Sequence, residues 1–265
     1  MIPEEFILPI EFSGDNPWNK SEFNNIIVII GSESEMASVL IPHLKKTYYV
    51  IGIDVVKTIS NTPHEYHQVD ICDKENLFQV IPESSIVINL STGVKQGWDG
   101  LAHVEIEGTK NLLEICVQNN IQRVIHMSSS HTMGWYERLW IQGQDHIPVI
   151  PNMYPRPDGL YGISKSTAEL MCRYVSDSTK MPITVLRVGT FRQHMTKQEL
   201  INSQELPYLG YGEKRKERLH RTWLEHQDLC SAVDEELQKN DRFTLRYLTS
   251  SPEQYQWNHT PLNDN

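Results

Sequence analysis

The stretch IIVIIGSESEMASVLIPHLKK, residues 26–46, decides the fold class. It starts with Ile26–Ile30, an unbroken β-branched run that is typical of a strand buried on both faces of a sheet. A short turn follows, and apolar residues then recur with helical spacing over residues 34–46. A buried strand that leads directly into a helix is the first half of a βαβ unit, so the stretch predicts a parallel sheet covered by helices.

The same alternation of strand and helix patterns continues to residue 189. Further strands are predicted at residues 49–54, 67–70, 85–90, 123–128 and 183–189, and helices at residues 74–80, 101–119 and 161–176. Strands that alternate with helices of this length predict an α/β fold, a doubly wound parallel sheet with right-handed crossovers.

Changes of pattern divide the chain into three segments. Residues 1–24 are rich in Pro, Asn, Glu and Trp, and we expect them to form an N-terminal extension. Residues 25–190 carry the alternating pattern and are predicted to be a Rossmann-like dinucleotide-binding domain. From residue 191 the chain turns to polar, charged and aromatic stretches, so residues 191–265 are expected to form a small substrate-binding lobe over the carboxyl edge of the sheet.

The composition argues against several classes of protein. The formal net charge is -10, and the basic residues gather only in residues 214–221, so no nucleic acid and no membrane surface is expected as a partner. No apolar run approaches the ~20 residues of a membrane span, and the acidic start MIPEEF does not resemble a signal peptide. Four distant cysteines without a CxxC pair favour reduced thiols in a cytoplasmic protein. No metal site is predicted, because His64 and His67 are better explained as surface residues.

The segment RPDGLYGISKSTAEL, residues 156–170, carries the chemistry. Tyr161 and Lys165 are four residues apart at the start of a predicted helix, which puts both on one helical face. An ammonium group beside a phenol stabilises the phenolate, so the tyrosine can act as a base below its free pKa of about 10. A Tyr–Lys pair on a solvated helix is the ordinary alternative. The serine-rich strand end HMSSSH, residues 126–131, precedes it here and favours catalysis.

A nucleotide would bind beyond the carboxyl ends of the strands, where the first strand leads into GSESEMA. A dinucleotide-binding loop needs three glycines there, but only Gly31 is present, with Ser34 and Ala37 at the other two positions. Ser34 is the more serious change, because the middle glycine lets the backbone approach a pyrophosphate. Glu33 and Glu35 add negative charge next to the same place, so this loop alone is weak evidence for a nucleotide.

Other strand ends favour a dinucleotide. Asp54 closes the second strand, where a carboxylate can hold both ribose hydroxyls and repel a 2′-phosphate, which predicts NAD rather than NADP. Asp70 and Ile71 end the third strand and can bracket an adenine. Residues 89–93, NLSTG, offer small side chains over which a cofactor can lie.

Together these segments resemble the extended short-chain dehydrogenase/reductase superfamily, in its NAD-dependent epimerase/dehydratase group, over residues 25–192. Within that group they are most similar to the uronate dehydrogenases. The similar segments are SSSHTMGWYER (128–138), RPDGLYGISK (156–165) and RLHRTWLEHQDL (218–229). Three segments that agree in order make the resemblance fairly specific.

The resemblance implies a role for each matching position. The catalytic residues are Ser129, which polarises the reacting oxygen, Tyr161, the general acid/base, and Lys165. The cofactor-binding residues are Gly31, Ser34, Asp54, Asp70, Ile71, Leu90, Ser91 and again Lys165. The substrate-binding residues are Thr92, Ser130, His131, Thr190 and Arg218, the last of which grips a substrate carboxylate.

The chain departs from the family pattern in several places. Two loop glycines are missing, and Glu105 stands where the superfamily usually has asparagine in the helix of the fourth crossover. WIQGQDHIPVIPN (140–152) and residues 193–217 are apparent insertions, so the match at Arg218 depends on a gap.

We therefore expect an NAD-dependent oxidoreductase that acts on a sugar or sugar acid, and the resemblance implies a homodimer. A catalytically silent nucleotide- or metabolite-binding protein is the alternative from a different class. A nucleotide-sugar epimerase or dehydratase that uses the same triad is a third possibility.

Overall fold

A computed structural model describes residues 25–57, 60–143, 148–203, 214–250 and 260–264. The predicted extension, residues 1–24, lies outside this described part of the chain. No helix within it combines the length and the apolar content that a bilayer span requires. Cys116, Cys172 and Cys230 are buried free thiols, and Cys72 is a half-buried one.

The described strands form one eight-stranded sheet in the order β3-β2-β1-β4-β5-β6-β7-β8. Their bounds are β1 Ile26–Ile30, β2 Tyr49–Asp54, β3 Glu65–Gln68, β4 Ile86–Asn89, β5 Arg123–Ser129, β6 Ile183–Val188, β7 Phe243–Leu248 and β8 Leu262–Asp264. The first seven strands run parallel, and β8 is antiparallel to β7. The predicted α/β class with a doubly wound parallel sheet is confirmed.

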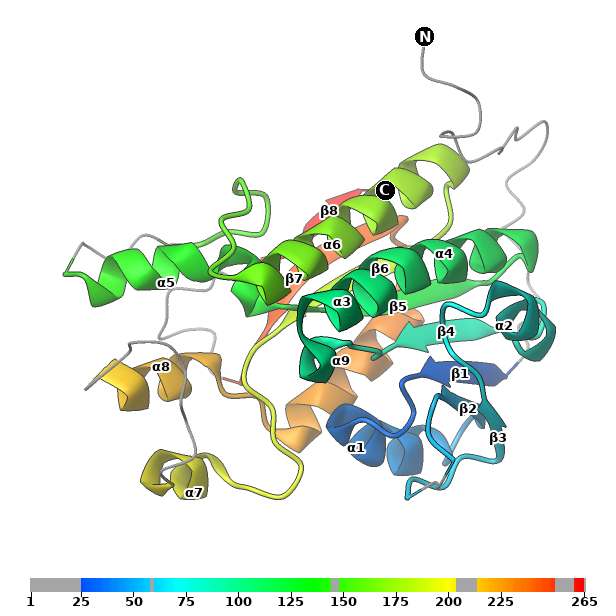
Figure 1. The fold of residues 1–265 in the computed structure, drawn as a ribbon, viewed down its shortest axis with the longest axis horizontal. Coiled ribbons are helices and arrows are strands. Elements are labelled where there is room, and N and C mark those ends of the chain that lie inside the picture. The colour runs from blue at the N-terminus through cyan, green and yellow to red at the C-terminus, as the bar shows by residue number, and fades with distance from the viewer. Residues whose placement is uncertain (1–24, 58–59, 144–147, 204–213, 251–259, 265) are drawn as a thin grey trace, which may run out of the picture.

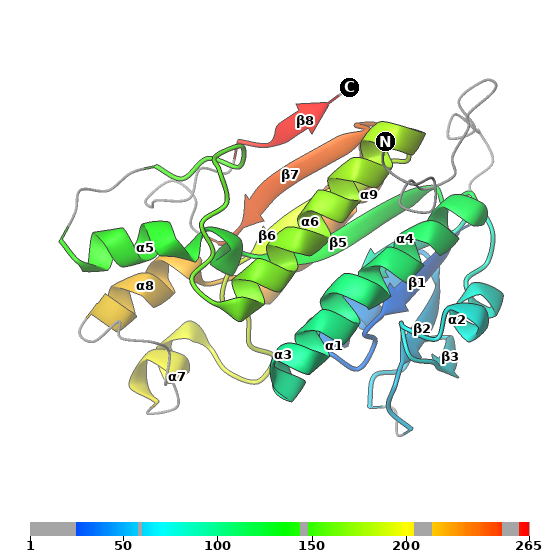
Figure 2. The same cartoon turned by 45° about the horizontal axis from the view of Figure 1, so that its top comes forward.

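Helices cover both faces of this sheet (Figures 1 and 2). The α-helices are α1 Glu35–Leu44, α2 Lys74–Val80, α3 Gly97–Leu101, α4 Thr109–Gln118, α5 Gly134–Ile141, α6 Leu160–Thr179, α7 Lys197–Asn202, α8 Arg215–Thr222 and α9 His226–Gln238. Short turns η2 Val94–Gln96 and η4 Ser130–Met133 are 3-10 helices, whereas η3 Ala102–Gly108 is a π-helix between α3 and α4. In Figure 2, α4 and α6 lie side by side across one face.

The run in β1 explains why two separate cores form. Ile27 and Ile29 face the core under α1 and α9, while Val28 and Ile30 face the core under α2, α4 and α6. Because successive side chains in a strand point to opposite faces, a strand between two helical layers needs apolar residues at every position.

The sheet continues past residue 190, where the sequence pattern appeared to end. Strand β7 pairs with β6, and α9 packs on the sheet beside α1. The pattern in β7 is interrupted by Arg246, whose Nη1 donates to Glu235 of α9 at 3.0 Å. Among the described residues after 190, α7 and α8 are the helices that lie beyond the carboxyl ends of β5 and β6 (Figure 1). The division at residue 190 and a substrate-binding role for residues 191–265 stay predictions.

Candidate active site

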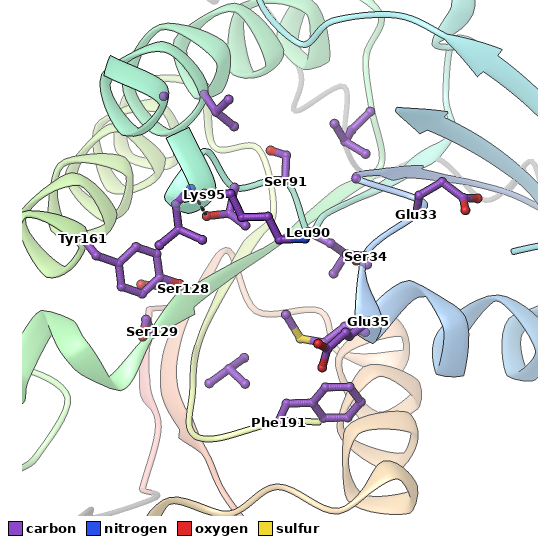
Figure 3. A pocket seen from close by; sticks show the side chains of 18 of the residues that line it. Glu33, Ser34, Glu35, Leu90, Ser91, Lys95, Ser128, Ser129, Tyr161 and Phe191 are labelled. Carbon is purple, nitrogen blue, oxygen red and sulfur yellow. Dashed lines mark hydrogen bonds between the residues drawn. The ribbon is translucent and has the colours of Figure 1, made fainter. Parts of the chain in front are cut away.

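One cavity of about 990 Å³ lies over the carboxyl ends of the central strands, where the strand order reverses around β1. Figure 3 shows Tyr161 and Ser129 on one side of it, and Ser34 and Glu33 on the other. Its wall contains these predicted site residues: Gly31, Ser34, Asp54, Asp70, Ile71, Leu90, Ser91, Thr92, Ser129, Ser130, His131, Tyr161, Thr190 and Arg218. Of the predicted residues, Lys165 alone is absent from this wall.

The loop after β1 makes a close backbone contact at Gly31. Its φ is +79°, and a Cβ built there would lie 2.8 Å from the backbone nitrogen of Ser91. Glycine is therefore required at this position on both counts. Ser34 is the N-cap of α1, and its Oγ accepts from the backbone N–H of Ala37 at 3.3 Å. The serine that replaces the middle glycine thus stabilises the start of the helix.

The two acidic residues of this loop have their carboxylates held by other loops. Glu33 accepts hydrogen bonds from the backbone and hydroxyl of Ser60, at 2.7 and 2.6 Å, and from the backbone of Asn61. Glu35 accepts from the backbone N–H of Gln193 at 3.2 Å and lies beside Phe191 (Figure 3). The side chain of Glu33 points away from the middle of the pocket. The predicted electrostatic opposition to phosphate is therefore weaker than the sequence alone indicates.

Asp54 sits at the outer end of the wall as predicted for a ribose ligand. One carboxylate oxygen accepts from the backbone N–H of Glu33 at 2.9 Å, and the other from that of Val55 at 2.8 Å. These two bonds fix the orientation of the carboxylate at the end of β2.

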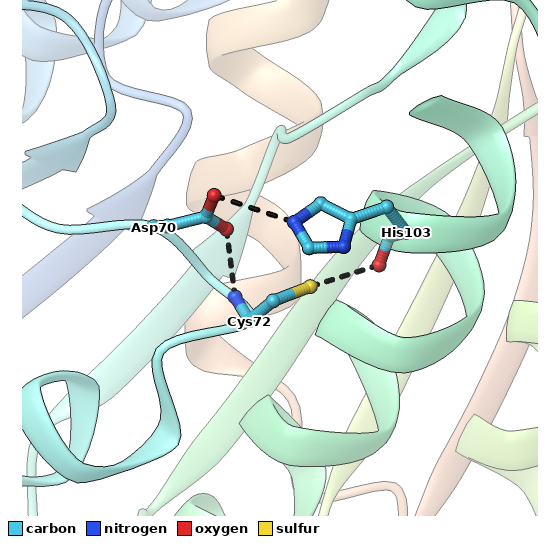
Figure 4. Close-up of side chains that lie close together, drawn as sticks. All are labelled: Asp70, Cys72 and His103. Carbon is cyan, nitrogen blue, oxygen red and sulfur yellow. Dashed lines mark hydrogen bonds and ion pairs between the residues drawn. The ribbon is translucent and has the colours of Figure 1, made fainter. Parts of the chain in front are cut away.

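A hydrogen-bonded cluster lies next to the predicted adenine position (Figure 4). Asp70 contacts the Nε2 of His103 at 3.3 Å and accepts from the backbone N–H of Cys72 at 2.8 Å, while the Cys72 thiol donates to the His103 carbonyl. Potential ligand atoms of these three residues lie within 4.8 Å of one another. Burial, together with Asp70 and Glu107, raises the pKa of Cys72 to about 12, so the thiol is protonated and able to donate this hydrogen bond.

Ser129 and Tyr161 meet at the junction of β5, η4 and α6. Ser129 ends β5, and its Oγ accepts from the backbone N–H of His131 at 3.2 Å. The ring of Tyr161, in the first turn of α6, lies edge-on to the His131 ring at 5.8 Å between centroids. A Cβ at Gly162 would lie 2.3 Å from the carbonyl of His131, so a glycine next to Tyr161 lets α6 pack directly on η4.

Lys165 lies beneath this junction and is 3% exposed. Its Nζ forms an ion pair with Glu105 at 2.8 Å and donates to the carbonyl of Met127 at 3.0 Å. Burial is the largest single influence and lowers the pKa of Lys165, but the charge and hydrogen bond of Glu105 together with the nearby Tyr161 raise it, and the net shift is upward. The ammonium group is therefore charged and compensated. Glu105 reaches it from the π-helical turn η3, a helix type that is frequent at functional sites.

Neutral groups complete the floor behind the pocket. The Nδ1 of His126 lies 3.2 Å from the side-chain amide nitrogen of Asn89, whose Oδ1 accepts from the hydroxyl of Ser91 at 2.7 Å. Complete burial, and to a lesser degree the charge of Lys165, lower the pKa of His126 to about 3. This histidine is thus neutral at physiological pH.

Each basic residue at the end of the wall near Tyr161 contacts a buried carboxylate. The Nε of Arg218 donates to Glu137 at 3.0 Å, and the Nδ1 of His131 lies 2.9 Å from Asp158. Burial alone would raise the pKa of Asp158, but the hydrogen bond with His131 and the charges of Arg218 and Arg138 hold it below its usual value. Arg218 is thus on the wall as predicted, with its charge balanced by Glu137.

A further buried ion pair, between Arg187 and Glu169, supports this region from behind the pocket. Arg187 of β6 binds Glu169 of α6 through two bonds, at 2.9 and 2.8 Å, and Glu169 accepts from the hydroxyl of Ser128 at 2.5 Å. A bidentate pair is geometrically strict, so it fixes α6 against the end of β5. The relative position of Tyr161 and Ser129 depends on this contact.

Residues 27–243 match the NAD dependent epimerase/dehydratase family. The chain belongs to this family. A relative within it, the NAD-dependent glucose-6-phosphate dehydrogenase of Haloferax volcanii, is 25% identical over 162 residues, which are 56% of this chain and 58% of that protein. The chain thus spans less than two thirds of that relative.

Uronate dehydrogenases are also among the similar proteins of this family. That of Pseudomonas syringae pv. tomato is 20% identical over 221 residues, 82% of this chain and 71% of that protein. The crystal structure of glucuronic acid dehydrogenase from Chromohalobacter salexigens superposes with a TM-score of 0.72 at 21% identity, covering 89% of this chain and 80% of that one. At this identity the likeness shows the fold.

NAD is the cofactor of the epimerase/dehydratase family, and the residues present fit it. Gly31 leaves room that a Cβ would fill, and the carboxylates of Glu33 and Glu35 are held by other loops. The wall is continuous from Asp54 to Tyr161. The degenerate loop therefore keeps the shape of a nucleotide cradle.

Sequence reasoning missed the buried carboxylates that pair with the basic residues of the site. Glu137 and Asp158 stand inside the segments quoted for their resemblance, and Glu105 was noted only as a departure from the pattern. The signal that could have found them is an acidic residue in an otherwise apolar or small-residue context. Their partners lie far away in the sequence and could not be read from it.

Proposed function

We propose that the chain is an NAD-dependent oxidoreductase that oxidises a hydroxyl group of a sugar or sugar acid. The observation that carries the proposal is that Ser129 and Tyr161 share one pocket wall at the carboxyl edge of the sheet, with the charged Lys165 one helical turn along α6. Family membership supports the cofactor, and the chemistry rests on these three side chains.

Bound NAD supplies the hydride acceptor in this family. The residues suited to hold it lie in the half of the wall near Asp54, where backbone groups, carboxylates and apolar side chains alternate. They are Gly31, Ser34, Asp54, Asp70, Ile71, Leu90 and Ser91.

Tyr161, as the phenolate, takes the proton from the substrate hydroxyl while the hydride leaves the same carbon. Ser129 donates a hydrogen bond to that oxygen as it becomes a carbonyl. The charge of Lys165 stabilises the phenolate, and Glu105 and the Met127 carbonyl hold the ammonium group in place. If the oxidised carbon is the anomeric one, as in the uronate dehydrogenases that the chain resembles, the product is a lactone.

The test is Tyr161→Phe, assayed by NADH formation with a panel of sugars and uronates. The rate should fall by a factor of at least ~10² because the proton acceptor is lost. NAD binding, measured by calorimetry, should be unchanged. Tyr174→Phe, on the exposed side of the same helix, is the matched control and should keep full activity. Undiminished turnover by the Tyr161 variant would refute the proposed mechanism.

A catalytically silent nucleotide- or metabolite-binding protein is the second candidate. It is favoured by the ion pair between Lys165 and Glu105, because a compensated ammonium group stabilises a phenolate less than an isolated one does. Thermal unfolding with NAD and NADP, followed by the sugar panel, separates the two. Stabilisation by NAD without turnover of any sugar would support the silent protein.

We also propose a homodimer in which a second copy covers the outer face of α6. Ile163, Leu170 and Tyr174 are 44%, 66% and 42% exposed, and their spacing of seven and four residues forms one apolar stripe. Sedimentation should give a dimer for the wild type and a monomer for Leu170→Glu. A monomeric wild type at micromolar concentration would contradict this.

A further inference from the structure

Three basic side chains in the described part of the site have a buried carboxylate from another element behind them. These carboxylates have side chains 1% to 3% exposed, so water does not screen them. The three pairs are Lys165 with Glu105, Arg218 with Glu137, and His131 with Asp158.

The ion pair between Arg218 and Glu137 determines the charge that the wall near Tyr161 presents to a substrate. Arg218 comes from α8 and lines the pocket, whereas Glu137 comes from α5 and lies behind it, with Nε and Oε2 3.0 Å apart. The arginine side chain is 10% exposed and the glutamate 3%. A buried guanidinium group that already binds a carboxylate has its charge balanced before any ligand arrives.

The remaining charges of this end also balance. The hydrogen bond with His131, and then the charges of Arg218 and Arg138, hold the pKa of the Asp158 carboxyl down. Arg138 also donates to the backbone carbonyl of Asp158 at 2.9 Å. Among the described residues, two cations, Arg138 and Arg218, thus stand against two carboxylates, Asp158 and Glu137. A substrate carboxylate here would therefore be an additional, uncompensated negative charge.

Two further basic residues line the pocket without an ion pair to any carboxylate in the described ranges. Lys95 is exposed, so a contact with it is screened by water. Arg192 is next to Gln193, whose backbone N–H donates to Glu35 at the start of α1. It therefore belongs to the half of the pocket beside the loop between β1 and α1, which is called the phosphate half below. Neither supplies a buried cation beside Tyr161.

The wall around Tyr161 instead offers hydroxyl groups. Ser130, Thr92 and Thr190 line it, and the hydroxyl of Thr190 lies 2.9 Å from that of Thr222. A hydroxyl both donates and accepts, which matches the hydroxyl groups of a neutral sugar.

We propose that the substrate is a neutral aldose rather than a uronate, and that Glu137 sets this preference by balancing the charge of Arg218. This inference rests on the proposed oxidoreductase function and names the substrate class of the same site. Glu137 does not line the pocket, so it acts through Arg218 as a specificity-determining residue.

The experiment uses substrate pairs that differ only at C6, D-glucose with D-glucuronate and D-galactose with D-galacturonate. NADH formation by the wild type should give a kcat/KM for the better aldose at least ~10-fold above that of its uronate. A uronate with the higher kcat/KM overturns the inference and leaves the proposed oxidoreductase function standing.

The decisive variant is Glu137→Gln, which keeps a hydrogen-bond acceptor for Arg218 and removes the negative charge. It should shift the uronate-to-aldose ratio of kcat/KM toward the uronate by about 10-fold, while a merely structural residue would lower both rates together. Glu217→Gln, which removes an exposed carboxylate from the same helix as Arg218, is the control and should leave the ratio unchanged. An unchanged ratio in Glu137→Gln overturns the inference.

A binding measurement keeps the inference testable if turnover is absent. Calorimetry of NAD-loaded Tyr161→Phe with the same four sugars should show heat for an aldose and weaker or no heat for its uronate. Tighter binding of the uronate overturns the inference. Binding without wild-type turnover would contradict only the proposed reaction, and neither binding nor turnover of any sugar would overturn both.

Discussion

The two halves of the pocket hold their acidic residues in opposite ways. In the half near Asp54, Glu33 and Glu35 are drawn aside by backbone donors of neighbouring loops. In the half near Tyr161, Glu105 and Glu137 are buried and bind cations. The number of carboxylates near each half is similar, but their effect on a ligand is not.

The difference is one of burial. An exposed carboxylate is screened by water and salt, so at the phosphate half it weakens binding only slightly. A buried carboxylate interacts strongly with its partner, so in the chemical half it determines whether a cation is available to a ligand. Acidic residues next to a site are therefore interpretable only when the direction and depth of each side chain are known.

The largest effect on this comparison is expected from Glu105→Ala. It removes one partner of a buried ion pair and leaves the charge of Lys165 uncompensated, so the free energy of unfolding should fall by about 3–5 kcal/mol. Glu107→Ala is the control on the same helical segment, because its carboxylate is exposed and its ion pair with Lys110, at 3.5 Å, lies in solvent. That variant should change stability by less than about 0.5 kcal/mol in urea denaturation. Equal, small losses in both variants would mean that Glu105 is not the buried partner of Lys165.

A second substitution tests the backbone contact of the phosphate half. In Gly31→Ala the new Cβ meets the Ser91 backbone at a positive φ, whereas at Gly143, with φ +87°, nothing lies within 4 Å. Gly143→Ala should therefore lose only the conformational preference, about 1 kcal/mol, and Gly31→Ala should lose a further 1–3 kcal/mol, roughly, from the clash. Denaturation midpoints measure both. Identical losses would show that the loop can move away from Ser91.

The neutral floor behind the chemical half predicts a pH dependence. Because the folded-state pKa of His126 is lowered to about 3, the unfolded chain takes up a proton below pH 6.5 that the folded chain does not. His126 therefore leaves the free energy of unfolding undiminished above pH 6.5. As the pH falls below 6.5, this residue lowers the free energy of unfolding by about 1.4 kcal/mol per pH unit. His126→Gln should flatten the curve of unfolding free energy against pH between 6 and 5. Parallel curves for the two proteins would contradict a buried neutral histidine.

The smallest effect is expected from Ser34→Gly, which restores the missing loop glycine. A glycine N-cap should lower stability by only a few tenths of a kcal/mol. NAD should bind about fivefold more tightly, close to 1 kcal/mol, because the backbone can approach the pyrophosphate. Calorimetric titration measures the Kd. Glu33→Gln should leave that Kd unchanged, since its carboxylate binds Ser60; a large gain there would mean that its charge does reach the phosphates.

Much of the fold was predictable because it depends on local pattern. The apolar run Ile26–Ile30 and the helix over residues 74–80 were placed correctly, and the pocket contains nearly every predicted site residue. The third strand was misplaced by two residues, at 67–70 instead of Glu65–Gln68, because HQVD carries too few apolar residues to fix its register. Strand β7 was missed because Arg246 interrupts its pattern and is satisfied only by a partner on another element.

The sequence alone determined the layer architecture, since strand and helix periodicities are properties of neighbouring residues, and it determined the Tyr161–Lys165 spacing for the same reason. Only the tertiary structure decided the charges of the site. Arg218 and Glu137 are 81 residues apart, and Lys165 meets Glu105 across two helices. Whether two distant charges pair depends on which faces the fold buries together, and no local pattern records that.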